Sequence, residues 1–314
     1  MLSRTADSLF WLGRYTERAG NVARGLAVAS HMAALSARLG SEGEEWRSLL
    51  DASGGEAGFY RKYPAPTQDA VVHWLVYDPG NPSGIIPCIE AARRNARTVR
   101  TALTVDMWEA LNDTWNRLRD LAPEATEGGN LPEFLGWVRE RVTLFNGAAH
   151  DTMLRDEAWR FVQLGTMLER ADNTARLLDV KHHLLAPAAD GTVDYMQWQA
   201  ILRSVSALRS YQWIYRDRLE PRRIAELMIL RPELPRSLMA CHAQVAETLD
   251  AIATGQGGRR GECHRMAGEL QARLRFGRID AILAAGLHAF LTDMIIRAAD
   301  LGTEIERFYI QAAG

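Results

Sequence analysis

Apolar residues recur along this chain at intervals of three and four, the spacing that places them on one face of an α-helix. No run alternates apolar and polar residues cleanly over the length of a strand. The first apolar stripe runs from Leu9 to Leu26, and Ser3 or Thr5 is suited to cap the start of that helix. The pattern therefore predicts an all-α fold.

Clusters of glycine, proline and other turn-forming residues divide the chain into segments of helical length. Segments of this kind, joined by short connections, are typical of a helical bundle, and we expect about ten to twelve helices. The predicted loops lie at 53–55, 64–66, 79–82, 127–130, 187–191 and 255–261.

The chain also contains an internal repeat. The segment 12–28 returns as 164–180, shifted by 152 positions, and ten of its seventeen residues are identical in the two copies. A second correspondence follows at a shift of 153, in which two prolines and a cysteine near residues 79–88 match those near 232–241. We therefore predict a tandem duplication of two pseudo-symmetric halves, 1–150 and 151–314, which share one interface because no flexible linker separates them.

The repeated segment carries a polar stripe. On a helix, residues three and four apart share a face, so Glu17, Asn21 and Arg24 are expected to line up, with Arg18 on a neighbouring stripe. These polar types persist in both halves although other surface positions have changed. Their copies are Glu169, Asn173, Arg176 and Arg170.

Two interpretations of this stripe remain open. In the structural one, the two copies meet in a buried network in which each glutamate accepts from an arginine of the other half. In the functional one, the same groups frame a polar cleft. Glu17 and Glu169 would then act as bases or bind an amine, while the arginines bind a carboxylate or phosphate and the asparagines orient it.

A further arginine-rich segment, 92–100, occurs in the first half only. Its four arginines are distributed around much of a helix, and one interpretation is a solvated face. The alternative is a polar contact surface for an anion or an acidic partner, formed by Arg93, Asn95 and Arg97.

Composition adds few constraints. The net charge of −2 provides no overall attraction to nucleic acid or anionic lipid. Of the 37 basic residues, 35 are arginine. Genomic composition is the simpler explanation, and bidentate contacts to carboxylates or phosphates are the functional alternative. No phosphate-binding loop or nucleophile motif is present in the sequence.

Cysteine spacing and the N-terminus favour an intracellular protein. Cys88, Cys241 and Cys263 show no paired spacing, so neither a metal site nor a disulfide framework is predicted. The first residues lack the order of a signal peptide, and no apolar stretch approaches the roughly 18 to 20 residues that span a bilayer. We expect a cytoplasmic protein with no membrane or nucleic-acid partner.

Several motifs together resemble the bacterial alpha-E family, and the resemblance covers essentially the whole chain, as one unit over 1–314. The motifs are MLSRTA at 1–6, FWLGRYxERAxNxAR at 10–24, NPS at 81–83, RNAR at 94–97 followed by WEALN at 108–112, LRSVSA at 202–207 and PRSL at 235–238.

This resemblance implies an all-helical protein encoded beside, or fused to, a circularly permuted ATP-grasp protein, often with a transglutaminase-like peptidase nearby. ATP-grasp enzymes activate a carboxylate for attack by an amine. The resemblance thus implies a role in an amide-forming system, through binding of a carboxylate- or amine-bearing substrate or of the ligase itself. The chain would need no cofactor of its own, with ATP and Mg²⁺ on the ligase. The alternative is a non-catalytic helical scaffold whose repeated motif is a structural network.

Overall fold

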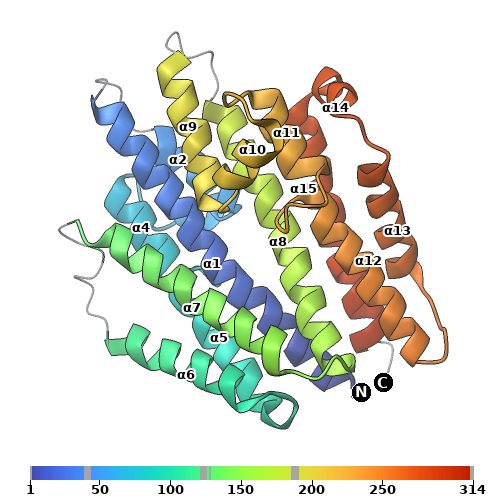
Figure 1. The fold of residues 1–314 in the computed structure, drawn as a ribbon. Coiled ribbons are helices and arrows are strands. Elements are labelled where there is room, and N and C mark those ends of the chain that lie inside the picture. The colour runs from blue at the N-terminus through green and yellow to red at the C-terminus, as the bar shows by residue number, and fades with distance from the viewer. Residues whose placement is uncertain (1, 39–43, 121–125, 127–128, 185–190, 312–314) are drawn as a thin grey trace.

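The computed structural model describes residues 2–38, 44–120, 126, 129–184 and 191–311 (Figure 1). Within them it contains fifteen α-helices and no strand, which confirms the all-α prediction. The helices are α1 (Ser3–Arg38), α2 (Glu44–Ser53), α3 (Glu56–Phe59), α4 (Gln68–Val76), α5 (Ile85–Thr98), α6 (Val105–Asp120), α7 (Leu131–Thr152), α8 (Glu157–Leu184), α9 (Gly191–Ser204), α10 (Leu208–Tyr215), α11 (Pro221–Leu230), α12 (Leu238–Gly255), α13 (Glu262–Arg275), α14 (Ile279–Ala285) and α15 (Leu287–Glu306).

The described residues form more helices than the ten to twelve expected, because some helices are too short for periodicity to reveal. Helix α3 has four residues. Helices α14 and α15 are separated at Gly286, whose φ of +102° breaks the helix in a conformation that glycine tolerates best. The predicted loops at 53–55, 64–66, 79–82 and 255–261 fall between helices, while parts of 127–130 and 187–191 lie outside the described residues.

The long helices α1 and α8 lie side by side at the centre of the molecule (Figure 1). Leu9, Phe10 and Leu12 of α1 point in different directions around the helix, yet all three are completely buried. A helix that is apolar on more than one side must be surrounded by other helices, and this explains the central position of α1.

Two glycines allow α1 and α8 to approach each other closely. A Cβ atom added at Gly13 would lie 2.3 Å from the carbonyl oxygen of Val162, and one added at Gly165 would lie 2.0 Å from that of Phe10. Neither position accepts a side chain without a shift of backbone. The repeated Leu-Gly step is therefore the point where the two helices cross.

The remaining helices pack around this pair. Helices α5 and α7 pack on α1, and α12 and α15 pack on α8. Two contacts cross over, since α2 packs on α8 and α9 packs on α1. Helices from the N-terminal part of the chain thus pack on both α1 and α8. Residues that are distant in sequence therefore come together around one site.

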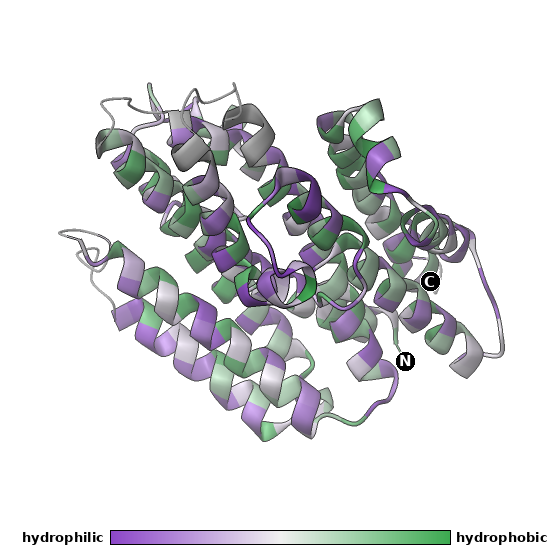
Figure 2. Cartoon of the chain, turned by 45° about the horizontal axis from the view of Figure 1, so that its top comes forward, coloured by the Kyte–Doolittle hydropathy of each residue, from purple (hydrophilic) through white to green (hydrophobic). Residues whose placement is uncertain are grey.

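The outer helices carry hydrophilic and hydrophobic residues in stripes along their length (Figure 2). Among the described residues, no single helix is both long and apolar enough to cross a membrane. One bent pair, Ile279–Ala285 with Leu287–Gln311 at 100°, passes that test by length and composition.

Candidate functional site at the crossing of helices α1 and α8

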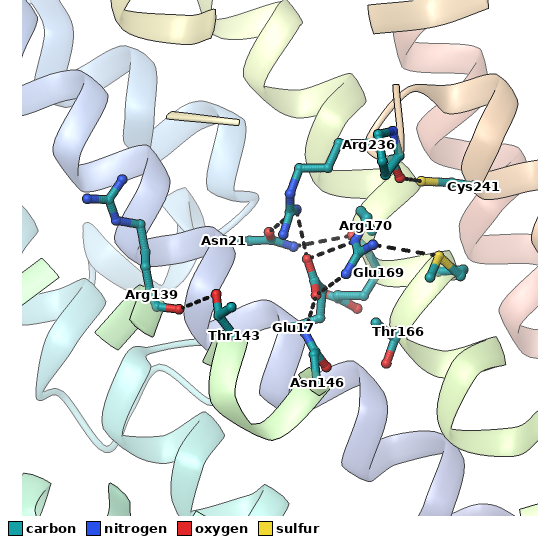
Figure 3. A network of polar contacts seen from close by, with 12 residues as sticks. Glu17, Asn21, Arg139, Thr143, Asn146, Thr166, Glu169, Arg170, Arg236 and Cys241 are labelled. Carbon is teal, nitrogen blue, oxygen red and sulfur yellow. Dashed lines mark hydrogen bonds and ion pairs between the residues drawn. The ribbon is translucent and has the colours of Figure 1, made fainter. Parts of the chain in front are cut away.

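Glu17 of α1 lies in a closed cage of donors (Figure 3). Arg170 of α8 donates from Nε and Nη2 to its two carboxylate oxygens, at 3.3 and 3.0 Å. Arg236, just before α12, donates from Nη1 at 2.8 Å, and the amide of Asn146 in α7 donates at 3.3 Å. The Glu17 side chain is only 1% exposed, so this carboxylate is buried and fully paired.

Glu169 of α8 lies in a second cage, held mainly from α1. Arg18 donates from Nε and Nη2, at 2.5 and 2.8 Å, and Arg14 donates from Nε at 2.9 Å. The Glu169 side chain is 6% exposed, but Arg14 and Arg18 are 15% and 21% exposed. The Arg170 and Arg236 side chains around Glu17 are 13% and 14% exposed, so Arg18 is the one arginine of the two cages that is clearly more exposed than the others.

The pKa values of both carboxyl groups are lowered. Burial alone would raise the pKa of Glu17, but the charges of Arg170 and Arg236 outweigh it and hold that pKa far below its usual range. Burial likewise opposes ionisation of Glu169, and Arg18 and Arg14 lower its pKa. Both groups are carboxylates at neutral pH.

The two cages are related by reciprocal contacts. Glu17 pairs with Arg170 and Glu169 pairs with Arg18. The two glutamates are 152 positions apart in the chain, and so are the two arginines. Because the Glu-Arg dipeptide occurs on both crossing helices, each copy supplies the charge that the other one needs.

The reciprocity extends to the last arginine of the motif. Arg24 donates to the carbonyl oxygen of Ser204 at 2.5 Å, and Arg176 donates to that of Ala52 at 2.9 Å. The two acceptors are again 152 positions apart and lie near the ends of α9 and α2. Arg176 also pairs with Asp172 at 2.7 Å, whereas burial followed by repulsion from Arg236 lowers the pKa of Arg24 to about 9.

A cavity of about 430 Å³ opens beside the Glu169 cage. This volume lies within the roughly 300–1,000 Å³ typical of small-molecule sites. Its lining comes from α1, α8 and α15 and from the end of α2, the segment 53–58, Trp74 and the segment 80–83. The motif residues that line it are Arg18, Asn21, Glu169, Asn173 and Arg176.

Two buried polar atoms in residues of the cavity wall have no hydrogen-bond partner. They are Nε1 of Trp74, a donor, and Oδ1 of Asn173, an acceptor. A buried polar atom without a partner is costly, and most such atoms in native proteins are satisfied. Arg61 also borders the cavity and forms no ion pair with any described residue.

Glycines keep the cavity open on the Trp74 side. A Cβ atom at Gly58 would lie 3.0 Å from two ring carbons of Trp74, and one at Gly55 would lie 3.1 Å from its Nε1. Gly54 has a φ of +70°, which ends α2 and turns the chain toward α3. The sequence marked this segment as a loop, but only the fold shows that it covers the indole.

The structure separates the motif residues that the sequence grouped together. Glu17, Arg24 and Arg170 do not line the cavity and lie on the side of the closed cage. The sequence reasoning missed Arg61, Trp74 and Asp172, since none of them matches a motif that repeats. Ser83 of the cavity wall lies in the segment 81–83 that contributed to the family resemblance, and it accepts from Nη1 of Arg18 at 3.4 Å.

The arginine-rich segment of α5 lies elsewhere. Arg93 donates to Oδ1 of Asn112 at 2.9 Å and lies over the ring of Trp108, so it turns toward α6. Asn95 is partly buried and Arg97 is exposed. None of the three borders the cavity.

No group of three or more metal-ligating side chains is present among the described residues. Cys88, Cys241 and Cys263 are buried and free. Burial raises the pKa of the Cys88 thiol to about 12 and that of Cys241 to about 11. Protonated, buried thiols of this kind are poor nucleophiles.

The fold and site define an all-helical protein with a pair of Glu-Arg dipeptides at a central helix crossing. The chain belongs to the Alpha-E family, described as a predicted alpha-helical domain with a conserved ER motif, whose model matches residues 1–310. Glu-Arg occurs here at 17–18, 140–141, 169–170 and 306–307. The copies at 17–18 and 169–170 are the two that exchange ion pairs between α1 and α8.

Distant relatives occur in mycobacteria. Proteins of Mycobacterium bovis and Mycobacterium tuberculosis, both described as uncharacterized, are 26% identical to this chain over 335 aligned residues. The alignment covers 93% of this chain but only 35% of each relative, so the chain spans about a third of their length. No solved structure shows significant similarity to the chain.

Proposed function

We propose that this chain is the helical, substrate-binding component of an amide-forming system and that it acts beside a circularly permuted ATP-grasp ligase. The ligase holds ATP and Mg²⁺, and this chain holds a small carboxylate- or amine-bearing substrate in the cavity beside Glu169. The ligase partner, and a transglutaminase-like peptidase as a further component, rest on the family resemblance. The extra length of the mycobacterial relatives is compatible with a second module next to the matched region.

One observation carries the binding role. Five of the eight polar motif residues line a single cavity of about 430 Å³. Unpaired polar atoms of Asn173 and Trp74 belong to residues that line this same cavity. A purely structural network would gain nothing from an adjoining void, since empty space forfeits packing energy.

Glu169 acts in this proposal by holding Arg14 and Arg18 in place, because a carboxylate that accepts from two guanidinium groups is a weak base. Glu17 is more remote from any substrate, because its side chain is 1% exposed and does not line the cavity. The predicted catalytic roles of both glutamates stay predictions.

The second candidate, a non-catalytic scaffold, is favoured by the closed cage of Glu17. Four hydrogen bonds from Arg170, Arg236 and Asn146 satisfy its carboxylate within the interior. Burial of a charge pair without further use is typical of a structural network. In this view the motif joins the helices and the ligase docks on the exposed arginines of α5.

The tandem arrangement of the halves 1–150 and 151–314 belongs to the same proposal. The reciprocal pairs of the two Glu-Arg dipeptides support it, as do the contacts from Arg24 and Arg176 to carbonyls 152 positions apart. Cys88 and Cys241 add a further match, since each thiol faces the carbonyl of the proline six positions earlier.

Co-expression with an ATP-grasp protein of the kind that the family resemblance implies tests the proposal. The expected result is a complex and an ATP-dependent amide product, detected by mass spectrometry. Ala299→Phe, at an exposed helical position that borders the cavity, should abolish the product. Ala272→Phe, at an exposed position of α13 outside the cavity, is the matched control. Full product from the folded Ala299→Phe protein would reject the binding role and favour the scaffold.

A further inference from the structure

The cavity beside Glu169 carries an excess of positive charge. Among the residues that the structure describes, four guanidinium groups and two carboxylates border it. Arg14 and Arg18 share Glu169, Arg176 pairs with Asp172, and Arg61 has no ion-pair partner among the described residues. These charged groups therefore sum to a net charge of +2. This excess disfavours a bound amine and favours a bound anion.

Two donors lie close together at the edge of the cavity, the buried Nε1 of Trp74 and the guanidinium of Arg61, whose side chain is exposed. A Cβ atom at Gly58 would lie 3.0 Å from the ring of Trp74 and 3.8 Å from Nη2 of Arg61, so the indole and this guanidinium meet at the same glycine. The unpartnered Nε1 of Trp74 faces the neighbouring Gly55. Both groups donate hydrogen bonds and neither accepts, and such a pair is suited to a carboxylate.

Helix α8 offers an acceptor instead. Oδ1 of Asn173, a residue that lines the cavity, is buried and has no partner among the described residues, so an N–H group of a bound molecule would satisfy it once the side chain turns toward the cavity. A ligand that pairs with the donors of Arg61 and Trp74 and with the Asn173 oxygen has at least one carboxylate and one N–H group. The size of the cavity restricts it to a small molecule.

We infer that the cavity binds a small acidic amino-acid derivative or peptide end, with its carboxylate at Arg61 and Trp74 and its N–H group at Asn173. This inference rests on the proposed binding function and narrows it, because the earlier choice between a carboxylate and an amine is resolved in favour of the carboxylate. Two carboxylates on the ligand would match the surplus of two positive charges.

Titration calorimetry of the full chain with three probes of similar length tests the inference. N-acetylglutamate has two carboxylates and an N–H group, its diamide has the same shape without charge, and 1,5-diaminopentane has two positive charges. We expect binding of the first, weakening as salt rises, and at least about tenfold weaker binding of the other two.

Variants locate the binding. Arg61→Gln should weaken N-acetylglutamate binding about tenfold, and Trp74→Phe, which removes the N–H group but keeps a ring, should weaken it about threefold. Arg119→Gln removes an exposed arginine of α6 outside the cavity and should leave affinity unchanged. An equal loss in Arg119→Gln and Arg61→Gln would overturn the assignment to this site.

The outcomes also separate this inference from the proposed function. If the diamine binds and N-acetylglutamate does not, the cavity remains a binding site but the carboxylate assignment is wrong. If no probe binds and Ala299→Phe leaves the amide product unchanged, both the inference and the binding function fail. If N-acetylglutamate binds as expected but no amide product forms with the ligase, the inference stands and the amide-forming role falls.

Discussion

The Glu17 and Glu169 cages begin from the same sequence motif and end in different environments. Each carboxylate takes a paired contact from the arginine that follows the other glutamate. The additional guanidinium differs, because Arg236 reaches Glu17 from before α12 and Arg14 reaches Glu169 from α1 itself. The position 153 before Arg236 is Ser83, which has a short side chain and leaves room for the cavity.

The segment that follows α2 and its counterpart after α9 also differ in the size of their side chains. Gly54, Gly55 and Gly58 border the cavity, and the positions 152 later are Ser206, Ala207 and Ser210. Gly54 and Ser206 both have positive φ, at +70° and +60°, although only glycine adopts that conformation without strain. The comparison teaches that one repeated motif has a closed structural copy and an open copy, and that small residues distant from the motif make the difference.

The largest expected effect is that of removing the charge from the closed cage. Glu17→Gln leaves Arg170 and Arg236 buried without a counter-charge, so we expect the free energy of unfolding to fall by about 3–5 kcal/mol. Urea denaturation followed by circular dichroism measures this change.

Glu169→Gln is the matched variant in the open cage. Arg14 and Arg18 border the cavity, so water can solvate them after the change, and we expect a smaller loss of about 1–3 kcal/mol. Equal losses in the two variants would contradict the difference between the cages.

The helix crossing provides the next prediction. Gly165→Ala places a methyl group against the backbone of Phe10, and Gly13→Ala does the same against Val162. We expect each to lower the free energy of unfolding by about 1–3 kcal/mol, because the helices must move apart. If the crossing is symmetric the two losses agree, and a loss in one variant alone would show that the repeat does not carry equal contacts.

Acid stability tests the charge of the closed cage. The folded-state pKa of Glu17 is lowered, so its contribution to stability is present above the unfolded value of about 4.3 and is lost as pH falls toward the folded value. We expect the unfolding free energy of the wild type to decrease below about pH 4.3. In Glu17→Gln this decrease should be shallower, and an unchanged acid slope would refute the assigned pKa direction.

The smallest expected effect on stability is that of Ser206→Gly, on the side of the closed cage. Ser206→Gly relieves a positive φ at a non-glycine residue, so we expect a gain of about 1 kcal/mol or less in unfolding free energy. Gly54→Ala, at the equivalent position beside the cavity, should cost a comparable amount. Thermal unfolding of both variants measures the two shifts, and destabilisation by Ser206→Gly would show that its side chain has a further role.

The sequence by itself determined the helical class, the repeated motif and the two Glu-Arg dipeptides that supply part of the central ion pairs. These properties follow from local periodicity and from residue types on one helix face, which neighbouring residues specify. Pairing of each glutamate with an arginine of the other half was one of the two interpretations that the sequence left open. The break at Gly286 and the four-residue α3 escaped prediction, because such short elements have no measurable period.

Only the tertiary structure decided which copy of the motif borders open space. Trp74 and Arg61 reach the cavity because α2 and its neighbours pack on α8, a contact between segments more than a hundred positions apart. Arg236 closes the other side by pairing with Glu17, from which it is 219 positions distant in the chain. Such long-range contacts arise from the packing of whole helices and leave no periodic signal in the chain, so two copies with nearly the same polar residues acquired different environments.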